Sequence, residues 1–338
     1  MSSAGKLPSE TERTLVRKSG AWTNPSYGCY PEKRPIHEYI EKGVVNIDKP
    51  RGPTSHEVAA WVKDILGVNT AGHAGSLDPK VTGLLPILLG KATKAVPALR
   101  LSGKEYVCLL RLHREMPPKL IRKVCEEFSG PIYQVPPIKS AVKRVLRIRT
   151  IYYIEVLEIE SSSVLFRVGC EAGTYIRKLC HDIGLALGSG GHMQELRRTK
   201  VGPFTERTLV TLQDLKDAYV FWKEDGDESE IRRVIMPMEM AVSHLPGIVL
   251  RDSAVDAVCS GASLAVPGIT SVDSNLKKGD IIALFSLKGE FVALAKAEMS
   301  TEEILKTSSG LAVTPVRVMM EAGTYTRGWT KKESSVML

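Results

Sequence analysis

The sequence predicts an α+β protein of two domains. Segments with the period of strands and segments with the period of helices are interspersed between residues 43 and 235. Short β segments separated by turn residues follow from Gly247, which predicts a small β-barrel. The chain has 338 residues, 43% of them hydrophobic and 25% charged, which is enough for two globular domains. The expected divisions are an N-terminal segment (1–42), a first domain (43–235), a linker (236–247), a second domain (248–325) and a tail (326–338).

The amino-acid composition indicates which kinds of binding partner and cellular compartment to expect. The formal charge of +8 favours a polyanionic partner, although many basic proteins never bind nucleic acid. No Cys-x-x-Cys pair occurs, so neither a zinc site nor a disulfide framework is expected, and a reducing compartment is favoured. The longest apolar run, 81–89, is short and is interrupted by Gly83 and Pro86, so no membrane span is expected. The six cysteines are Cys29, Cys108, Cys125, Cys170, Cys180 and Cys259.

The first domain begins with a predicted strand and helix. Residues 44–47 form the strand, and Thr54 with Glu57 is a capping box that starts a helix ending at Gly67. Residues 104–112 alternate as a strand does, and residues 118–128 have the pattern of an amphipathic helix.

A second strand and helix follow at residues 164–170 and after Thr174, which is placed to cap the helix. Arg177 falls in the first turn of that helix. A cation there opposes the helix dipole, so a specific anionic partner is expected for it.

The C-terminal region is predicted to contain a helix at 253–260, a hairpin of 281–284 with 291–295, and a strand at 311–319. Residues 22–42 are rich in proline and aromatic residues and are expected to be ordered but irregular. Residues 223–230 are acidic and contain glycine, which indicates a break before the linker.

The most informative stretch runs from Gly72 to Gly83 and contains one carboxylate, Asp78. Its glycines permit sharp bends and close approach of a ligand, and Pro79 restricts the backbone of Asp78. An ordinary turn, in which Asp78 only binds its own backbone, is the commoner explanation for an isolated Asp-Pro pair.

The whole string resembles a known motif. Residues 72–79, Gly-His-Ala-Gly-Ser-Leu-Asp-Pro, resemble the catalytic motif of the TruB family of RNA pseudouridine synthases, in which Thr is more usual at the position of Ser76. Further matches are Asp48 to Ser55, Lys104-x-Tyr106, Gly173 to Arg177, Leu196 to Phe204, and, for a PUA domain, Val266 to Ile269 with Lys278 to Asp280. The pattern is similar to the dyskerin-type branch in its archaeal form, whose N-terminal arm, here 1–42, packs along the C-terminal domain.

The resemblance implies a role for each matched residue. Asp78 would act at C1′ or C2′ of the ribose, as a nucleophile or as the base that gives a glycal, and Arg177 would keep it ionised. Tyr106 would stack on the uracil and accept the C5 proton, although a tyrosine in a strand is more often a core residue.

The remaining matched residues would bind the substrate or support the site. Tyr175 and Leu196 would wall the pocket, and His73 would hold the extruded nucleotide. Lys49 and Pro50 would support the Asp78 loop. The basic stretch 138–150 resembles a flexible thumb loop that clamps RNA, with Lys143, Arg144 and Arg147 as its binding residues, although such a run is commonly a solvated surface. No metal or cofactor is implied.

The resemblance also implies a fold and a function. The catalytic domain should contain a mixed, mainly antiparallel sheet flanked by helices, followed by a PUA β-barrel. The expected activity is isomerisation of uridine to pseudouridine in rRNA, as catalytic subunit of an H/ACA guide-RNA particle, and in the T loop of tRNA. The implied partners are the guide RNA, a small zinc-ribbon-type protein, a glycine/arginine-rich-type protein and a kink-turn-binding ribosomal-type protein.

Other functions stay open at this point. A stand-alone tRNA enzyme and a non-catalytic RNA scaffold are the main alternatives, and a free-nucleoside glycosylase is weaker because it needs no PUA domain. The archaeal form implies a cytoplasmic location, and a eukaryotic form would be nucleolar.

Overall fold

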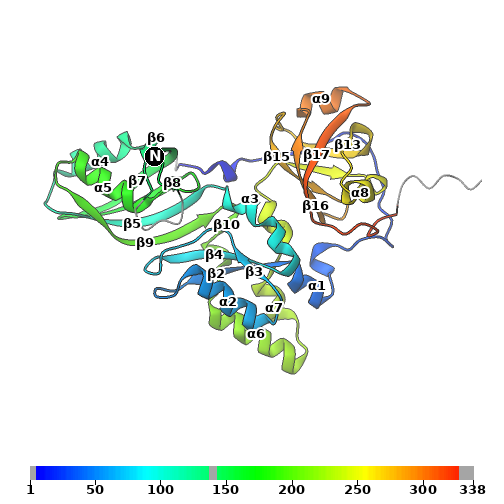
Figure 1. Cartoon of the computed structure of the whole chain (residues 1–338), viewed down its shortest axis with the longest axis horizontal. Coiled ribbons are helices and arrows are strands. Elements are labelled where there is room, and N and C mark those ends of the chain that lie inside the picture. The colour runs from blue at the N-terminus through cyan, green and yellow to red at the C-terminus, as the bar shows by residue number, and fades with distance from the viewer. Residues whose placement is uncertain (1–4, 137–142, 327–338) are drawn as a thin grey trace, which may run out of the picture. The chain divides into compact units, whose positions relative to one another are not determined.

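The computed structural model describes residues 5–136 and 143–326, which divide into two compact units (Figure 1). The first unit contains 43–236 together with the start of the chain up to Thr11. The second contains 12–42 and the residues from Pro237 onward. The placement of residues 5–11 differs from the expectation that the whole of 1–42 packs on the C-terminal domain. Leu7 is buried in the first unit, and Glu10 forms an ion pair of 2.7 Å with Lys200.

A long sheet forms the centre of the first unit. Within the described residues it has ten strands in the order β11-β2-β4-β9-β5-β8-β7-β6, with β3 against β4 and β10 against β9. Its pairs are mainly antiparallel, and β4 runs parallel to β9, so the predicted mixed sheet is confirmed. The strands are β2 (Gly43–Lys49), β3 (Ala71–His73), β4 (Thr82–Leu89), β5 (Lys104–Leu112), β6 (Gly130–Gln134), β7 (Arg147–Glu160), β8 (Ser163–Cys170), β9 (Gly191–Val201), β10 (Phe204–Thr205) and β11 (Met236–Pro237).

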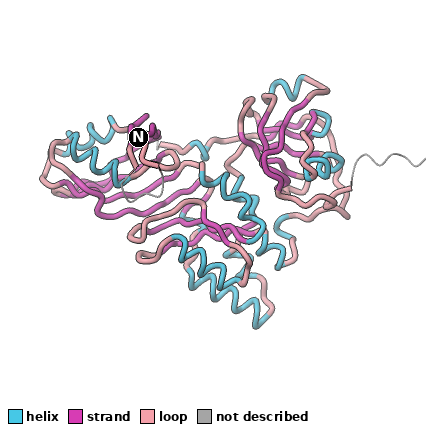
Figure 2. Tube along the Cα trace, in the orientation of Figure 1, coloured by secondary structure: helices cyan, strands magenta, loops and turns pink. Residues whose placement is uncertain are grey.

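Helices flank this sheet, as Figure 2 shows in cyan against magenta strands. Two of them, α4 and α5, cover one part of the sheet and bury a shared core against β5 and β8, with Ile121, Leu179 and Phe166 fully buried. Three others, α2, α6 and α7, lie near β2 and β4 (Figure 1). The helices of the unit are α2 (Ser55–Leu66), α3 (Val96–Arg100), α4 (Pro118–Glu127), α5 (Ile176–Ala186), α6 (Leu212–Asp225) and α7 (Ser229–Val234).

Several local predictions are confirmed. The Thr54 hydroxyl accepts from the Glu57 amide and the Glu57 carboxylate accepts from the Thr54 amide, which is the predicted capping box. Gly67 ends α2 with φ of 64°, a conformation that suits glycine. Strand β5 spans the predicted residues 104–112.

Two local predictions are wrong. Residue Tyr175, not Thr174, is the N-cap of α5, because the Thr174 hydroxyl instead donates to the carbonyl of Glu171 at 2.7 Å. The predicted thumb loop 138–150 ends earlier than expected, because residues from Arg147 onward pair with β6 and belong to β7. Its residues 138–142, including Lys139, lie outside the described residues.

The second unit is rich in strands. Its described part has a seven-stranded sheet in the order β1-β14-β12-β15-β16-β17-β13 around a core that includes Ile282, Val292 and Val313. The predicted hairpin is confirmed as β15 and β16. The strands are β1 (Leu15–Arg17), β12 (Gly247–Leu250), β13 (Leu264–Ala265), β14 (Ile269–Asp273), β15 (Ile281–Phe285), β16 (Phe291–Ala297) and β17 (Leu311–Val318), and the helices are α1 (Ile36–Glu41), α8 (Asp252–Cys259) and α9 (Thr301–Lys306).

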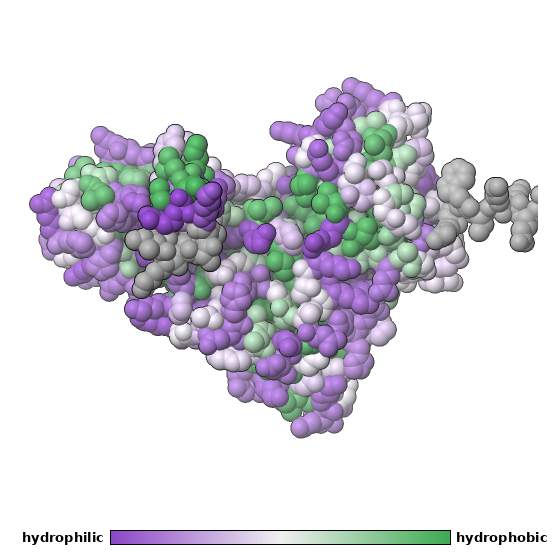
Figure 3. Space-filling view, in the orientation of Figure 1, coloured by the Kyte–Doolittle hydropathy of each residue, from purple (hydrophilic) through white to green (hydrophobic). Residues whose placement is uncertain are grey.

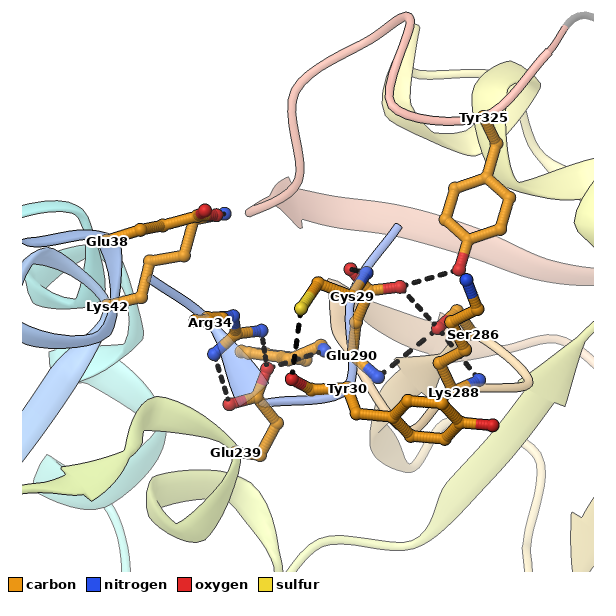
Figure 4. A network of polar contacts seen from close by, with 11 residues as sticks. Cys29, Tyr30, Arg34, Glu38, Lys42, Glu239, Ser286, Lys288, Glu290 and Tyr325 are labelled. Carbon is orange, nitrogen blue, oxygen red and sulfur yellow. Dashed lines mark hydrogen bonds and ion pairs between the residues drawn. The ribbon is translucent and has the colours of Figure 1, made fainter. Parts of the chain in front are cut away.

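The N-terminal part of the second unit is held by a polar network (Figure 4). Arg34 donates from two nitrogens to the two oxygens of Glu239, at 3.0 and 2.6 Å. The Cys29 amide and the Tyr325 hydroxyl donate to the carboxylate of Glu290, at 2.9 and 2.6 Å. Strand β1 adds to the edge of the sheet by pairing with β14. Residues 12–42 are therefore an integral part of this unit.

None of the helices in the described part of the chain combines the length and the apolar composition needed to span a bilayer.

Candidate active site

The loop that carries Asp78 connects β3 to β4 and is held in place by hydrogen bonds to buried polar side chains. The Leu77 amide donates to the Ser55 hydroxyl at 2.8 Å, at the start of α2. Lys49, which is fully buried, donates to the carbonyls of Val81 at 3.0 Å and of Pro79 at 3.2 Å. This confirms the predicted supporting role of Lys49. The loop is held on its buried side while the Asp78 side chain remains exposed.

Arg177 pairs with Asp78 although 99 residues separate them in the sequence. Arg177 lies in the first turn of α5, and its guanidinium donates to a carboxylate oxygen of Asp78. The two side chains are 51% and 53% exposed. The anionic partner expected for this cation is therefore Asp78, and the pair remains open to a substrate.

Gln134, which was not among the site residues predicted from the sequence, positions the start of α5. Its buried side chain accepts from the Tyr175 amide at 2.9 Å and donates to the Tyr175 carbonyl at 3.1 Å. Tyr175 itself is partly buried and comes two residues before Arg177. An isolated glutamine gives no sequence signal for such a role, because both contacts are to the backbone of a distant segment.

Tyr106 lies on β5 opposite Arg198 of β9. Burial raises the pKa of the Tyr106 phenol, and the charge of Arg198 acts to lower it. Arg198 is 1% exposed and donates to the carbonyls of Leu84 at 2.8 Å and Gly75 at 3.1 Å. Arg198 was not among the residues predicted from the sequence. Strand alternation from Leu196 could have identified it, because residues 196 and 198 of one strand share a face.

Leu196 and Tyr106 both pack against the core that α4 and α5 bury. Leu196 is partly buried and lies opposite Cys108 in the β5 to β9 pairing. Leu196 and Arg198 of β9 thus lie on the same face of the sheet as Tyr106.

His73 lies at the end of β3 beside the Asp78 loop. Its ring meets the ring of His56 edge-on with a centroid distance of 4.7 Å, and its Nδ1 accepts from the Gly75 amide at 3.4 Å. Burial, and then the charges of His56 and Arg198, lower the pKa of His73 to about 4. The imidazole is therefore neutral at neutral pH, which is the form that can accept the Gly75 hydrogen bond.

A cleft of about 540 Å³ lies beside Arg177 and contains one of the three predicted RNA-binding cations. Arg144 lines it, with its Nε donating to the carbonyl of Pro136 at 3.2 Å. Lys143 is exposed, and Arg147 donates to its carbonyl at 3.2 Å. Besides Arg144 and Arg177, the residues that line the cleft are Val135, Pro136, Lys178, His181, Gly191, His192 and Met193.

The same region exposes apolar side chains. Tyr133 of β6 is 66% exposed and Ile148 of β7 is 55% exposed, and Figure 3 shows hydrophobic surface over β6. The surface next to the cleft is thus a mixture of cations and apolar groups, which suits stacked bases and phosphates.

Family models match most of the chain. The TruB family pseudouridylate synthase (N-terminal domain) model matches residues 63–119 and 114–176, and the tRNA pseudouridylate synthase B C-terminal domain model matches 177–243. A PUA domain model matches 246–319, and a DKCLD (NUC011) domain model matches 5–59.

Whole-chain relatives agree with these matches. The chain is 87% identical over 336 residues to a probable tRNA pseudouridine synthase B of Methanosarcina barkeri, with 99% of each chain covered. Among solved structures, it is 54% identical to a chain in an H/ACA RNP bound to a substrate RNA containing 2′-deoxyuridine, with a TM-score of 0.90 over 96% of this chain and 100% of that one. It is 56% identical to a chain in a Cbf5–Nop10–Gar1 complex, with a TM-score of 0.91 and coverage of 95% and 98%.

These matches span the unit that holds the Asp78–Arg177 pair and the strand-rich unit that follows it. They confirm the family that the motifs predicted. The chain belongs to the TruB family of pseudouridine synthases, which are isomerases acting on RNA, and it carries a PUA domain.

Proposed function

We propose that this chain is the catalytic subunit of an H/ACA guide-RNA particle that isomerises uridine to pseudouridine in rRNA, and that it also modifies the T loop of tRNA. The assembly is supported by the similarity to chains solved in an H/ACA RNP with substrate RNA and in a Cbf5–Nop10–Gar1 complex. The tRNA activity is supported by the name of the Methanosarcina barkeri relative. The implied protein partners are the zinc-ribbon-type, glycine/arginine-rich-type and kink-turn-binding proteins, and the implied location is the cytoplasm.

The observation that carries the chemistry is the half-exposed Asp78–Arg177 pair. A carboxylate held by a guanidinium stays ionised and keeps a fixed direction, and its exposure leaves it accessible to a ribose. Glycoside hydrolysis needs two carboxylates, because a leaving group must be protonated and a water molecule activated. In this isomerisation the departing uracil anion is itself the nucleophile, so one carboxylate is sufficient.

The other site residues take roles in binding. The target nucleotide leaves the RNA stack, and Tyr106 stacks on its uracil, with Tyr175 and Leu196 as further walls of the pocket. His73 supports the extruded nucleotide as a neutral imidazole. Lys143, Arg144 and Arg147 contact RNA phosphates around the cleft, because cationic side chains near a bound strand are the groups that neutralise its backbone.

The test is pseudouridine mapping with the full chain. One reaction contains the protein alone and a tRNA, and the other contains a guided rRNA fragment, the H/ACA guide RNA and the partner proteins. Modification in the guided reaction supports the particle, and modification of the T loop by the lone protein supports the tRNA activity. Modification of the T loop alone would favour a stand-alone enzyme.

The same two reactions with Asp78→Asn and with Asp64→Asn, an exposed aspartate of α2, separate loss of chemistry from loss of charge. Absence of product in both reactions with the unsubstituted chain would favour the scaffold.

A further inference from the structure

Arg198 is a buried cation without a carboxylate partner among the described residues. It is 1% exposed, it donates to the carbonyls of Leu84 and Gly75, and it lies directly opposite Tyr106 in the β5 to β9 pairing. A buried guanidinium that is not paired with an anion is costly, and proteins normally avoid it. Arg197, the preceding residue, illustrates the usual arrangement, because it pairs with Asp48 and Glu206 at 2.9 and 2.7 Å.

The surroundings of Arg198 are cationic or neutral. Burial lowers the pKa of Lys49, of Lys104 and of His73, and the charge of Arg198 lowers each of them further. Among the described residues, the titratable groups that act on Tyr106 are Arg198 of β9, which lies opposite it, and Cys170 of β8. Among these neighbours Tyr106, directly opposite Arg198, carries an acidic hydroxyl. Burial raises the pKa of this phenol and the Arg198 charge acts to lower it, so a phenolate formed at Tyr106 would supply the missing anion.

The geometry ties this pair to the catalytic loop. One guanidinium nitrogen of Arg198 donates to the carbonyl of Gly75, three residues before Asp78, and Arg198 lies directly opposite Tyr106 on the paired strand. Gly75 has φ of 135°, which favours glycine, and a Cβ there would meet Arg198 Nη1 at 3.8 Å. A single side chain therefore connects the loop of the carboxylate with the residue that faces the base.

Resting on the proposed function, we infer that Arg198 is a positioning residue that holds the Tyr106 hydroxyl and stabilises the Tyr106 phenolate while the C5 proton leaves the rotated uracil. After C5 has bonded to C1′, C5 carries both its hydrogen and the ribose, and N1 is doubly bonded to C6. The C5–H bond breaks, and its proton goes to the phenolate oxygen. Its electron pair forms the C5=C6 bond, the N1=C6 electrons move to N1, and N1 takes a proton from water. Tyr106 then returns its proton to solvent, and Arg198 stays protonated throughout.

The test measures proton removal itself, in single-turnover reactions on RNA whose target uridine carries hydrogen or deuterium at C5. Removing the charge with Arg198→Met should slow turnover by about a hundredfold, the size of a general-base contribution, with KM nearly unchanged. A primary isotope effect should be present in this variant, and the rising limb of its pH profile should shift to higher pH. Arg198→Lys should restore part of the rate, because it keeps the charge but loses the fork of donors.

The matched control is Arg197→Met, which removes the neighbouring arginine of the same strand. It should keep the isotope effect and the pH limb of the unsubstituted chain. The isotope effect is a ratio of two rates, so it does not depend on the fraction of a variant that is folded. An Arg198→Met protein without a primary isotope effect, or with an unshifted pH limb, would show that Arg198 is only structural and would overturn the inference. An unsubstituted chain that makes no pseudouridine would overturn the proposed function, and this inference with it.

Discussion

The two units each contain an arginine–carboxylate pair between distant segments, and the two pairs have opposite environments. In the second unit the side chains of Arg34 and Glu239 are 3% and 12% exposed, and both oxygens of Glu239 accept from Arg34. In the first unit Arg177 and Asp78 are each about half exposed. A buried pair that loses one partner leaves an uncompensated charge, whereas an exposed pair contributes little to stability. The exposure of the Asp78 pair thus indicates a role in binding and chemistry, and the burial of the Arg34 pair indicates a role in folding.

The largest effect is expected from Asp78→Asn. Pseudouridine formation should fall by about a thousandfold or more, because Asp78 is the only carboxylate among the described residues of the site. RNA affinity and the denaturation midpoint should change little, since exposed ion pairs contribute about 0 to 1 kcal/mol. Turnover and urea denaturation of the same preparation measure both quantities. Normal turnover in this variant would remove Asp78 from the chemistry.

Glu239→Gln should lower the stability of the second unit, whereas Asp78→Asn should lower activity and leave stability nearly unchanged. It removes the carboxylate to which two nitrogens of the buried Arg34 guanidinium donate, so the free energy of unfolding of the second unit should fall by about 3 to 5 kcal/mol. The carboxylate of Glu239 also accepts from the Phe291 amide at 3.0 Å, which increases the loss. Thermal unfolding followed by circular dichroism measures the change, with Glu302→Gln on the exposed surface of α9 as the control. Equal melting of the two variants would contradict the comparison.

The pH dependence of stability should show that the pKa of His73 is lowered in the folded protein. Burial holds the pKa of His73 at about 4 in the folded protein, below its ordinary value of 6.5. As pH falls from 6.5 towards 4, the unfolded chain binds this proton first, so the free energy of unfolding should decrease by about 1 to 2 kcal/mol after allowance for partial exposure. His73→Gln should remove that decrease, and His113→Gln, at an exposed position, should retain it. Chemical denaturation at a series of pH values gives the slopes, and parallel slopes for all three proteins would disprove the assignment.

The smallest effect concerns the cations near the cleft. Neutralising Lys143, Arg144 and Arg147 together should weaken RNA binding by about tenfold and reduce the slope of log K against log salt by about 2, if each contacts one phosphate of a single strand. Filter binding over a salt series measures the slope. The control is Lys306→Gln, which removes the charge of an exposed lysine on α9. An unchanged slope in the triple variant would exclude these residues from the RNA surface.

Local sequence patterns predicted much of the first unit correctly. The capping box of Thr54 and the alternation of residues 104–112 depend on neighbours within a few positions, and both are confirmed. Thr174 failed as a cap because its hydroxyl had a competing acceptor, the Glu171 carbonyl, that composition does not reveal. Residues 147–150 were assigned to a loop because their charge obscured a strand whose partner, β6, precedes the loop.

Some residues of the candidate site could also be predicted from the sequence, and others could not. The motif resemblance selected Asp78 and Arg177, and the structure brings them into contact. The sequence did not identify Arg198 and Gln134 as site residues, because their contacts are largely with backbone groups of distant segments. Such contacts do not depend on the side chains of those segments and so produce no sequence pattern. The type of a residue indicates what its side chain can bind, but not which carbonyl lies within reach of it.

The network around Glu290 also has a consequence for biosynthesis. Cys29 and Glu290 are 261 residues apart, so the segment 12–42 leaves the ribosome long before the strands that receive it. At about 5 to 20 residues per second, the wait is on the order of ten to fifty seconds. During translation the proline-rich segment has no native partner, while the intervening residues 43–236 can already complete their own core. Residues 12–42, although synthesised early, are thus among the last to reach their final place.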